Sequence, residues 1–69
     1  MKTFSMEQFA LAVREGRKEQ GMTQAVLAEK LGVSQRSVSR WETGKTMPDY
    51  ALLPALCEAL DVNPAELLN

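Results

Sequence analysis

The sequence predicts an all-α protein built from five short helices. Three observations support this fold class. Four helix-capping residues are each followed by a helical pattern, at Ser5, Thr23, Ser34 and Asn63. Glycines follow the first three predicted helices, at Gly21, Gly32 and Gly44. Between these signals the apolar residues recur every three or four positions, which is the spacing of one helix face.

The first helix should span about residues 6–20. Ser5 begins it, and Gln8 completes a capping box, in which each side chain binds the backbone amide of the other residue. Phe4 and Phe9 occupy the two positions of a hydrophobic staple across the same cap. The cap and the staple therefore predict the same start for this helix.

A glycine at position 16 interrupts this first helix. In a helix interior, glycine is about 1 kcal/mol less favourable than alanine. We expect close packing to offset this cost, with the missing side chain of Gly16 making room for Trp41.

The second and third helices should cover about residues 24–31 and 35–43, separated by the turn Gly32-Val33-Ser34. Thr23 and Ser34 cap them, and an apolar pair suited to a hydrophobic staple flanks each cap. Each helix is too short to be stable in isolation, so both must pack on the rest of the chain.

The fourth helix should cover residues 50–60, after a loop at residues 45–48. Pro54 lies within it, and proline fits the first turn of a helix because it lacks an amide hydrogen and clashes one turn back. We therefore expect the regular part of the helix to start late, near Ala51. The fifth helix should span residues 64–68, with proline at its first position.

Helical spacing also identifies the side chains that should form the core. Trp41 is expected there as an anchor of the third helix, and Cys57 as a small buried residue without a redox role. The complete predicted core consists of Phe9, Val13, Leu27, Ala28, Leu31, Val38, Trp41, Leu53, Leu56, Cys57, Leu60, Val62 and Leu67.

Composition argues against several classes of protein. The chain has one cysteine and no histidine, which leaves no intramolecular disulfide, no zinc site and no conventional acid–base pair. We therefore expect no metal, no cofactor and no enzymatic activity, although a carboxylate site using Glu7, Glu15 or Glu58 stays open. Because no signal peptide or membrane-spanning run is present, we expect a cytoplasmic protein.

The net charge of −1 conceals an uneven distribution. Residues 14–46 contain seven basic and four acidic side chains, a net charge of +3. Residues 47–69 contain four acidic side chains and no basic one, a net charge of −4. Because the local field matters more for phosphate binding than the total charge, the first of these segments could bind a nucleic acid. Such binding should be weak without the right base sequence and should weaken further with salt.

Residues 23–45, with the sequence TQAVLAEKLGVSQRSVSRWETGK, carry the functional signal. In the third helix Val38 and Trp41 share one face, while Arg36 and Arg40 lie nearly opposite. A short helix held by two apolar anchors and presenting polar and basic groups has the form that reading DNA requires. The alternative interpretation is an ordinary solvated helix face.

The stretch GMTQAVLAEKLGVSQRSVSRWETGKTMPDYALLPALCEALDVNPAELL resembles the helix-turn-helix domain of the phage Cro and repressor family. The motif W-E-x-G-K before a proline and the ending L-x-x-L-x-x-x-L-x-V carry the resemblance further. It covers nearly the whole chain, so residues 1–69 should form one domain. The resemblance implies a compact five-helix, lambda-repressor-like fold in which helices two and three form the helix-turn-helix. Helix three would enter the major groove, with helix two across the DNA backbone.

By this resemblance, helix three reads bases while its ends and helix two hold phosphates. The base-contacting residues would be Gln35, Arg36, Ser39 and Arg40. The phosphate-contacting residues would be Gln24, Ser34, Thr43, Lys45 and Thr46. Gln35 would also be placed to hydrogen-bond Gln24.

Arg17 and Glu42 have a structural role by the same resemblance. They would form a partly buried ion pair between the end of helix one and the end of helix three. A phosphate contact made by Arg17 is the alternative. If the pair is buried, removing one partner should destabilise the fold by more than the pair contributes.

The sequence therefore predicts sequence-specific binding of double-stranded DNA, by a bacterial or phage transcriptional repressor acting at the nucleoid. The family generally binds two-fold operators as dimers, so a homodimer on a palindromic operator is expected, with half-sites about 34 Å apart. Apolar residues outside the predicted core would supply the dimer contact, namely Leu52, Pro64, Ala65 and Leu68.

Two alternative functions stay open. A DNA-binding antitoxin or restriction–modification controller would use the same face and add a protein partner or an activating contact. In that case Val26 would be a partner contact rather than an ordinary surface valine. A protein-interaction module could have kept this fold and lost DNA binding. The chain could be a complete small regulator or the N-terminal part of a longer one.

Overall fold

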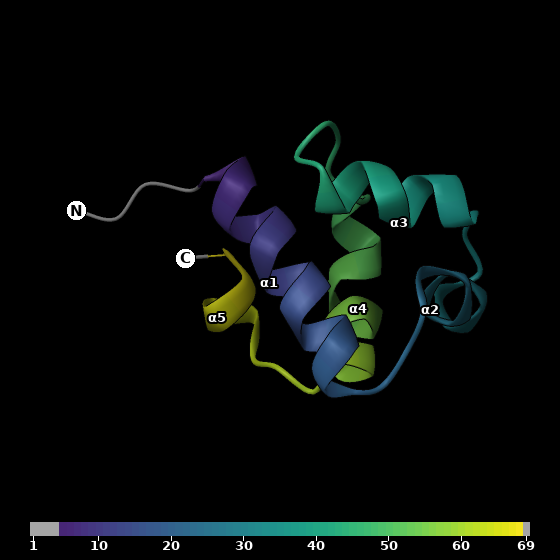
Figure 1. Ribbon diagram of the computed structural model, residues 1–69. Coiled ribbons are helices and arrows are strands. Elements are labelled where there is room, and N and C mark those ends of the chain that lie inside the picture. The colour runs from purple at the N-terminus through teal and green to yellow at the C-terminus, as the bar shows by residue number, and fades with distance from the viewer. Residues whose placement is uncertain (1–4, 69) are drawn as a thin grey trace.

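The computed structural model describes residues 5–68, apart from the side chain of Leu68, and over this range all regular secondary structure is helical (Figure 1). The elements are α1 (Met6–Glu19), α2 (Gln24–Leu31), α3 (Gln35–Glu42), a 3₁₀ turn η1 (Tyr50–Leu52), α4 (Leu53–Leu60) and α5 (Pro64–Leu68). The predicted all-α class and the order of five helices are confirmed. Within the same residues, no helix has both the length and the apolar character needed to cross a membrane.

Side-chain caps fix the starts of the first three helices where they were predicted. The hydroxyl of Ser5 accepts a hydrogen bond from the amide of Gln8 at 3.3 Å. Thr23 caps α2 through the amide of Val26 at 3.1 Å, and Ser34 caps α3 through the amide of Ser37 at 3.1 Å. The predicted staple residue Phe4 lies outside the described part of the chain.

The fourth helix starts later than expected. Tyr50–Leu52 form the 3₁₀ turn η1, and regular α-helix begins at Leu53, so the predicted start near Ala51 is wrong by two residues. Pro54 then falls in the first turn of α4, where its missing amide hydrogen is not needed. The helix ends at Asp61 in a left-handed conformation (φ 56°), a position usually taken by glycine.

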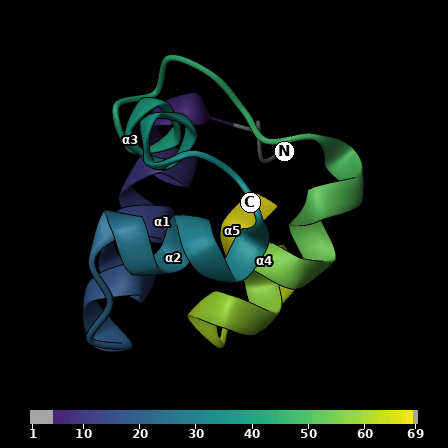
Figure 2. The ribbon, with the colours of Figure 1, turned by 90° about the vertical axis from the view of Figure 1, so that its right-hand side faces the viewer.

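The helices enclose one core around α1. Figure 1 shows α1 running through the middle of the molecule between α5 and the α2–α3 pair, and α1 packs on α3, α4 and α5. Seen end-on in Figure 2, α3 lies at one edge of the molecule with α2 beneath it. The predicted core residues that are buried are Phe9, Val13, Leu27, Ala28, Val38, Trp41, Leu53, Leu56, Cys57, Leu60 and Leu67.

Two predicted core residues, Leu31 and Val62, are only half-buried. Leu31 borders a surface groove with Ala55 and Ala59, whose small side chains leave part of it uncovered. Val62 lies in the α4–α5 connection and lines another groove, between α1 and α5. Conversely, the core includes Ala10 and Met22, which were not predicted.

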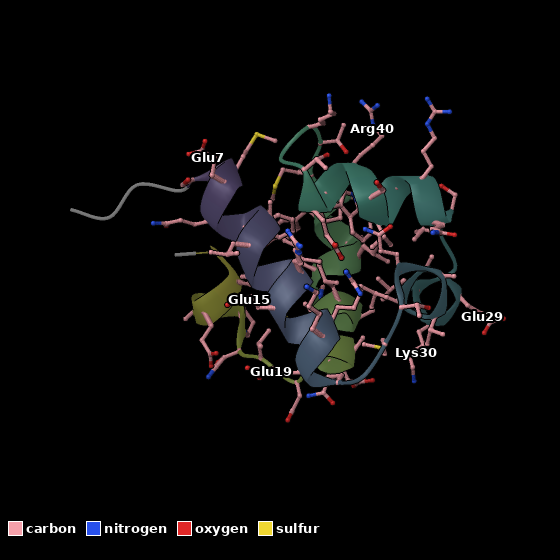
Figure 3. All side chains as sticks on the ribbon, in the orientation of Figure 1. Glu7, Glu15, Glu19, Glu29, Lys30 and Arg40 are labelled. Atoms are coloured by element: carbon pink, nitrogen blue, oxygen red, sulfur yellow. The ribbon has the colours of Figure 1, made fainter. Side chains whose placement is uncertain are left out.

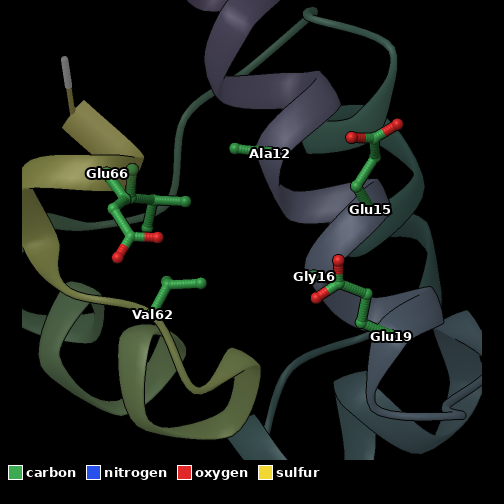
Figure 4. A pocket seen from close by; sticks show the side chains of 7 residues that line it. Ala12, Glu15, Gly16, Glu19, Val62 and Glu66 are labelled. Carbon is green, nitrogen blue, oxygen red and sulfur yellow. The ribbon is translucent and has the colours of Figure 1, made fainter.

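Gly16 makes room for Leu60, and the expectation that Trp41 would be its neighbour is wrong. A Cβ atom built on Gly16 would lie 3.2 Å from Leu60 Cβ, closer than most such contacts. The buried glycine therefore lets α4 approach α1. Gly16 and Ala12 also form the α1 side of the groove against α5, shown in Figure 4.

A bulky residue at position 16 should destabilise the protein. Gly16→Leu is expected to lower the free energy of unfolding by about 1–3 kcal/mol, because overpacking forces α1 and α4 apart. Urea unfolding followed by circular dichroism would measure the loss. Leu60→Ala in the same chain should relieve the clash, so the double variant should lose less than the sum of the two single variants. Strictly additive losses would contradict this account of Gly16.

Candidate nucleic-acid interface

Helix α3 presents one apolar face to the core and one polar face to solvent. Val38 is 0% exposed and Trp41 3% exposed, and these two side chains anchor the helix. Three of the four predicted base-contacting residues, Gln35, Arg36 and Arg40, are exposed, and the fourth, Ser39, is half-buried. In Figure 3 the side chain of Arg40 points away from the body of the protein. The helix can therefore offer amide and guanidinium groups to a flat or convex partner.

Hydroxyl groups at both ends of α3 are used inside the protein. Ser34 Oγ accepts the capping bond from the amide of Ser37 and lies 3.1 Å from Ser37 Oγ. Thr43 Oγ1 donates to the carbonyl oxygens of Ser39 at 3.1 Å and Arg40 at 3.2 Å. With its hydrogen occupied, the Thr43 hydroxyl has only lone pairs left, which a phosphate cannot use.

The remaining predicted phosphate ligands at this end lie beyond the turn after α3. Gly44 makes the turn in the left-handed region (φ 73°). Lys45 is exposed and Thr46 is half-buried, so the Lys45 ammonium is the group best placed to meet a phosphate. Thr43 therefore caps the C-terminal end of α3, and the exposed positive charge of Lys45 lies just after this end.

An ion pair between α1 and α3 lies directly beneath this surface. Arg17 Nε donates to Glu42 Oε2 at 2.7 Å, and Arg17 Nη2 donates to Glu42 Oε1 at 3.0 Å. The Arg17 side chain is 12% exposed and the Glu42 side chain 4% exposed. A third donor, Arg17 Nη1, bonds the carbonyl oxygen of Met22 at 2.9 Å, just before the cap of α2.

Gln24, a predicted phosphate ligand, also belongs to this network. Its Nε2 donates to Glu42 Oε1 at 3.0 Å. Among the described residues no hydrogen bond joins the side chains of Gln35 and Gln24, so the expected contact between them is not formed. The link from Gln24 to Glu42 was missed because the two residues are 18 positions apart and a polar residue in a first helical turn is ordinary.

The surroundings of Glu42 favour its charged form. Burial by itself raises the pKa of the carboxyl group. The hydrogen bonds from Arg17 and Gln24, together with the positive charges of Arg17 and Arg14, act in the opposite direction and prevail, so the pKa lies below its ordinary value. The hydrogen bond to Glu42 raises the pKa of Arg17 in turn, against a smaller opposing effect of burial.

Acidic side chains gather on a different side of the molecule. Glu15 and Glu19 on α1 and Glu66 on α5 rim the groove of Figure 4, over a floor that includes Val62. In Figure 3, Glu15 and Glu19 lie well apart from Arg40. The three acidic side chains of this groove therefore lie apart from the exposed arginines of α3, so a polyanion would meet less repulsion on the side that carries α3.

A family model described as helix-turn-helix matches residues 13–67, more than half of the chain. The chain belongs to the helix-turn-helix family. Within it, α2 and α3 are the two helices of the motif, joined by the turn at Gly32 in a left-handed conformation (φ 70°). The resemblance to Cro and repressor proteins is confirmed.

Two relatives of this helix-turn-helix chain are regulators. Repressor protein C2 of Salmonella phage P22 is 39% identical over 57 residues, which make up 83% of this chain and 26% of that protein. The transcriptional activator BcrR of Enterococcus faecalis is 34% identical over 62 residues, or 90% of this chain and 30% of that protein. The chain thus spans less than a third of the length of either relative.

Solved helix-turn-helix structures have the same fold. The P22 c2 repressor in complex with a synthetic operator has a TM-score of 0.83 and 36% identity, covering 88% of this chain and 92% of that one. The restriction-modification controller protein C.AhdI from Aeromonas hydrophila has a TM-score of 0.81 and 30% identity, covering 91% of this chain and 96% of that one. The predicted lambda-repressor-like fold is confirmed.

Removing the Glu42 side chain should destabilise the fold. Glu42→Ala is expected to lower the free energy of unfolding by about 3–5 kcal/mol near neutral pH, because it leaves the largely buried Arg17 without its partner. Thermal unfolding followed by circular dichroism would measure this. An unchanged melting temperature would contradict a structural role for the pair.

The same pair should make stability depend on pH in a definite direction. Because the pKa of Glu42 is lowered in the folded protein, its contribution is complete above the ordinary value of about 4.3 and is lost as the pH falls through the lower folded-state value. Urea unfolding at a series of pH values should show the wild type losing its advantage over Glu42→Gln in that acid range. A difference that stays constant through it would be inconsistent with the lowered pKa.

Proposed function

We propose that this chain is the DNA-binding part of a transcriptional repressor that recognises a two-fold operator as a homodimer. The observation that carries the proposal is the anchored helix α3, with Gln35, Arg36 and Arg40 exposed on its outer face. The similarity to the P22 c2 repressor in complex with a synthetic operator supports DNA binding by this chain. A protein of this kind would act in the cytoplasm, at the nucleoid, without catalysis, metal or cofactor.

Base recognition would come from the ends of these three side chains. Arginine can donate two hydrogen bonds to O6 and N7 of guanine, so Arg36 and Arg40 are suited to G·C pairs in the major groove. Gln35, at the start of α3, can likewise form two hydrogen bonds with adenine, one to N6 and one to N7. Ser39 is half-buried, and its hydroxyl group would form a hydrogen bond with the edge of a neighbouring base.

Phosphate contacts would fix the register of α3 in the groove. Lys45 supplies a positive charge after the C-terminal turn, with Thr46 beside it. Gln24 opens α2 on the other side of the motif. Ser34 would contribute through its place at the N-terminus of α3, where backbone amides can meet a phosphate. Thr43 donates both its hydroxyl hydrogen and its amide hydrogen to carbonyl oxygens of the protein, so it has no donor left for a phosphate.

The dimer would form through an apolar patch near the start of α4. Tyr50 is 84% exposed and lines a pocket together with Leu53, Pro54 and Pro64. A two-fold contact uses the same surface twice, and an exposed side chain next to a recess can be complementary to itself, as Tyr50 and this pocket are. Of the four dimer residues expected from the sequence, Pro64 lines this pocket, Ala65 is exposed and Leu52 is half-buried, whereas the side chain of Leu68 lies outside the described residues.

A restriction–modification controller is the second candidate. The structural similarity to C.AhdI favours it, and Val26 is 41% exposed on α2, where a partner could contact it. The two functions share DNA binding through α3 and differ in the effect on transcription. Reporter assays with the recognised operator would separate them, because a repressor lowers transcription at every level of expression.

Selection of bound duplexes from a random DNA pool tests the proposal. A palindromic motif should be recovered, and Arg36→Ala or Arg40→Ala should each weaken binding by about 1–3 kcal/mol and relax the base preference at one position of each half-site. Lys45→Ala is the matched comparison, since losing a phosphate contact weakens binding to all sequences and lowers the salt slope by about 1. Failure of the folded wild type to enrich any motif would favour the protein-interaction alternative.

The dimer patch can be tested separately from base reading. Tyr50→Glu should weaken self-association, because it places a charge in an apolar contact, and should remove cooperative binding to the full operator. Affinity for an isolated half-site should stay the same. The control is Ala51→Glu, which adds the same charge on the same turn but outside the pocket. Sedimentation and half-site binding would be measured for both variants. Equal effects of the two variants would argue against this dimer surface.

A further inference from the structure

The hydrogen bond between Gln24 and Glu42 connects the buried ion pair to the surface proposed to face DNA. Glu42 Oε1 accepts from Arg17 Nη2 and from Gln24 Nε2, each at 3.0 Å. We infer that Glu42 is a positioning residue for DNA binding, which holds the Gln24 amide so that its second N–H meets a backbone phosphate. This inference rests on the proposed DNA-binding function.

The first part of the inference concerns which end of the Gln24 amide faces inward. A carboxylate without a proton can only accept hydrogen bonds, so Glu42 selects the nitrogen of Gln24 and not its carbonyl oxygen. The Gln24 nitrogen carries two hydrogens, and one of them points to Glu42. Gln24 is half-buried, whereas the Glu42 side chain is 4% exposed. The amide group therefore lies between the interior and solvent with one donor still to be used.

Arg17 is what makes Glu42 a fixed acceptor. Two guanidinium nitrogens hold the two carboxylate oxygens at 2.7 and 3.0 Å, and the third bonds the carbonyl of Met22. Because both oxygens of the Glu42 carboxylate are hydrogen-bonded to Arg17, the carboxylate cannot rotate away from Gln24. Gln24 is thus ordered before DNA arrives, which reduces the entropy lost on binding.

Arg17 also removes an electrostatic conflict. A bare carboxylate beneath a phosphate ligand would repel the phosphate, and the guanidinium next to Glu42 cancels that charge. The network presented to DNA is therefore a neutral donor. Its loss should lower affinity without changing the number of counterions released, because salt dependence follows the charges that neutralise phosphates.

An apolar replacement of the ion pair separates positioning from stability. The double substitution Arg17→Met with Glu42→Leu keeps the net charge, and replacing both partners of a buried pair by apolar side chains often preserves stability. It removes the acceptor of Gln24. Operator affinity measured by fluorescence anisotropy should fall about tenfold, equivalent to about 1.4 kcal/mol, with an unchanged salt slope. Gln24→Ala should give a similar loss.

Combining the substitutions identifies the route of the effect. In the Gln24→Ala background the double substitution should cause little further loss, because Glu42 acts through Gln24. Gln20→Ala, which removes an exposed glutamine at the end of α1, is the matched control and should bind as the wild type does. Wild-type affinity in a folded Arg17→Met, Glu42→Leu variant would overturn the inference, as would additive losses with Gln24→Ala.

A measurement on the wild type keeps the test valid if that variant does not fold. The side-chain amide of Gln24 gives a pair of nitrogen–proton NMR signals, and adding the selected operator should shift them and slow their hydrogen exchange. Signals that stay in place while α3 signals move would overturn the inference and leave DNA binding intact. If the wild type binds no operator, the proposed function itself has failed.

Discussion

The bond between Arg17 and Glu42 is the interaction on which the rest of the structure depends. It joins α1 to α3, and its additional hydrogen bonds to Met22 and Gln24 bring in the start of α2. Helices of eight residues, such as α2 and α3, do not persist in water without tertiary support. Apolar packing at Val38 and Trp41 holds α3 onto the core. The bonds of Glu42 are directional, and one of them fixes the Gln24 side chain at the start of α2.

Polar groups near α3 divide into two sets. Ser34, Thr43 and Glu42 make their bonds inside the protein, at the two ends and the inner edge of the helix. Arg36 and Arg40 extend from the opposite face with no ion pair to any described residue. This division suits a reading helix, because groups that hold its shape do not compete with groups that meet a partner.

Local features were the ones that the sequence could predict. The caps at Ser5, Thr23 and Ser34 depend on residues three positions away, so the pattern of the chain determines them. Contacts between distant segments were harder to predict, because several side chains could be the partner of each residue. Gly16 faces Leu60 and not Trp41, and Gln24 bonds Glu42 and not Gln35. Leu31 and Val62 have the right spacing for the core, but their exposure depends on small neighbours contributed by other helices.

The acidic groove between α1 and α5 has a consequence for how a DNA-binding protein of this kind would find its site. Glu15, Glu19 and Glu66 would be repelled by a duplex that they approached first, so collisions in that orientation would end quickly. With a net charge of −1, even a correctly oriented encounter at a random sequence would be brief. The protein would search by many short visits rather than by long sliding, and would stay only where α3 recognises the bases.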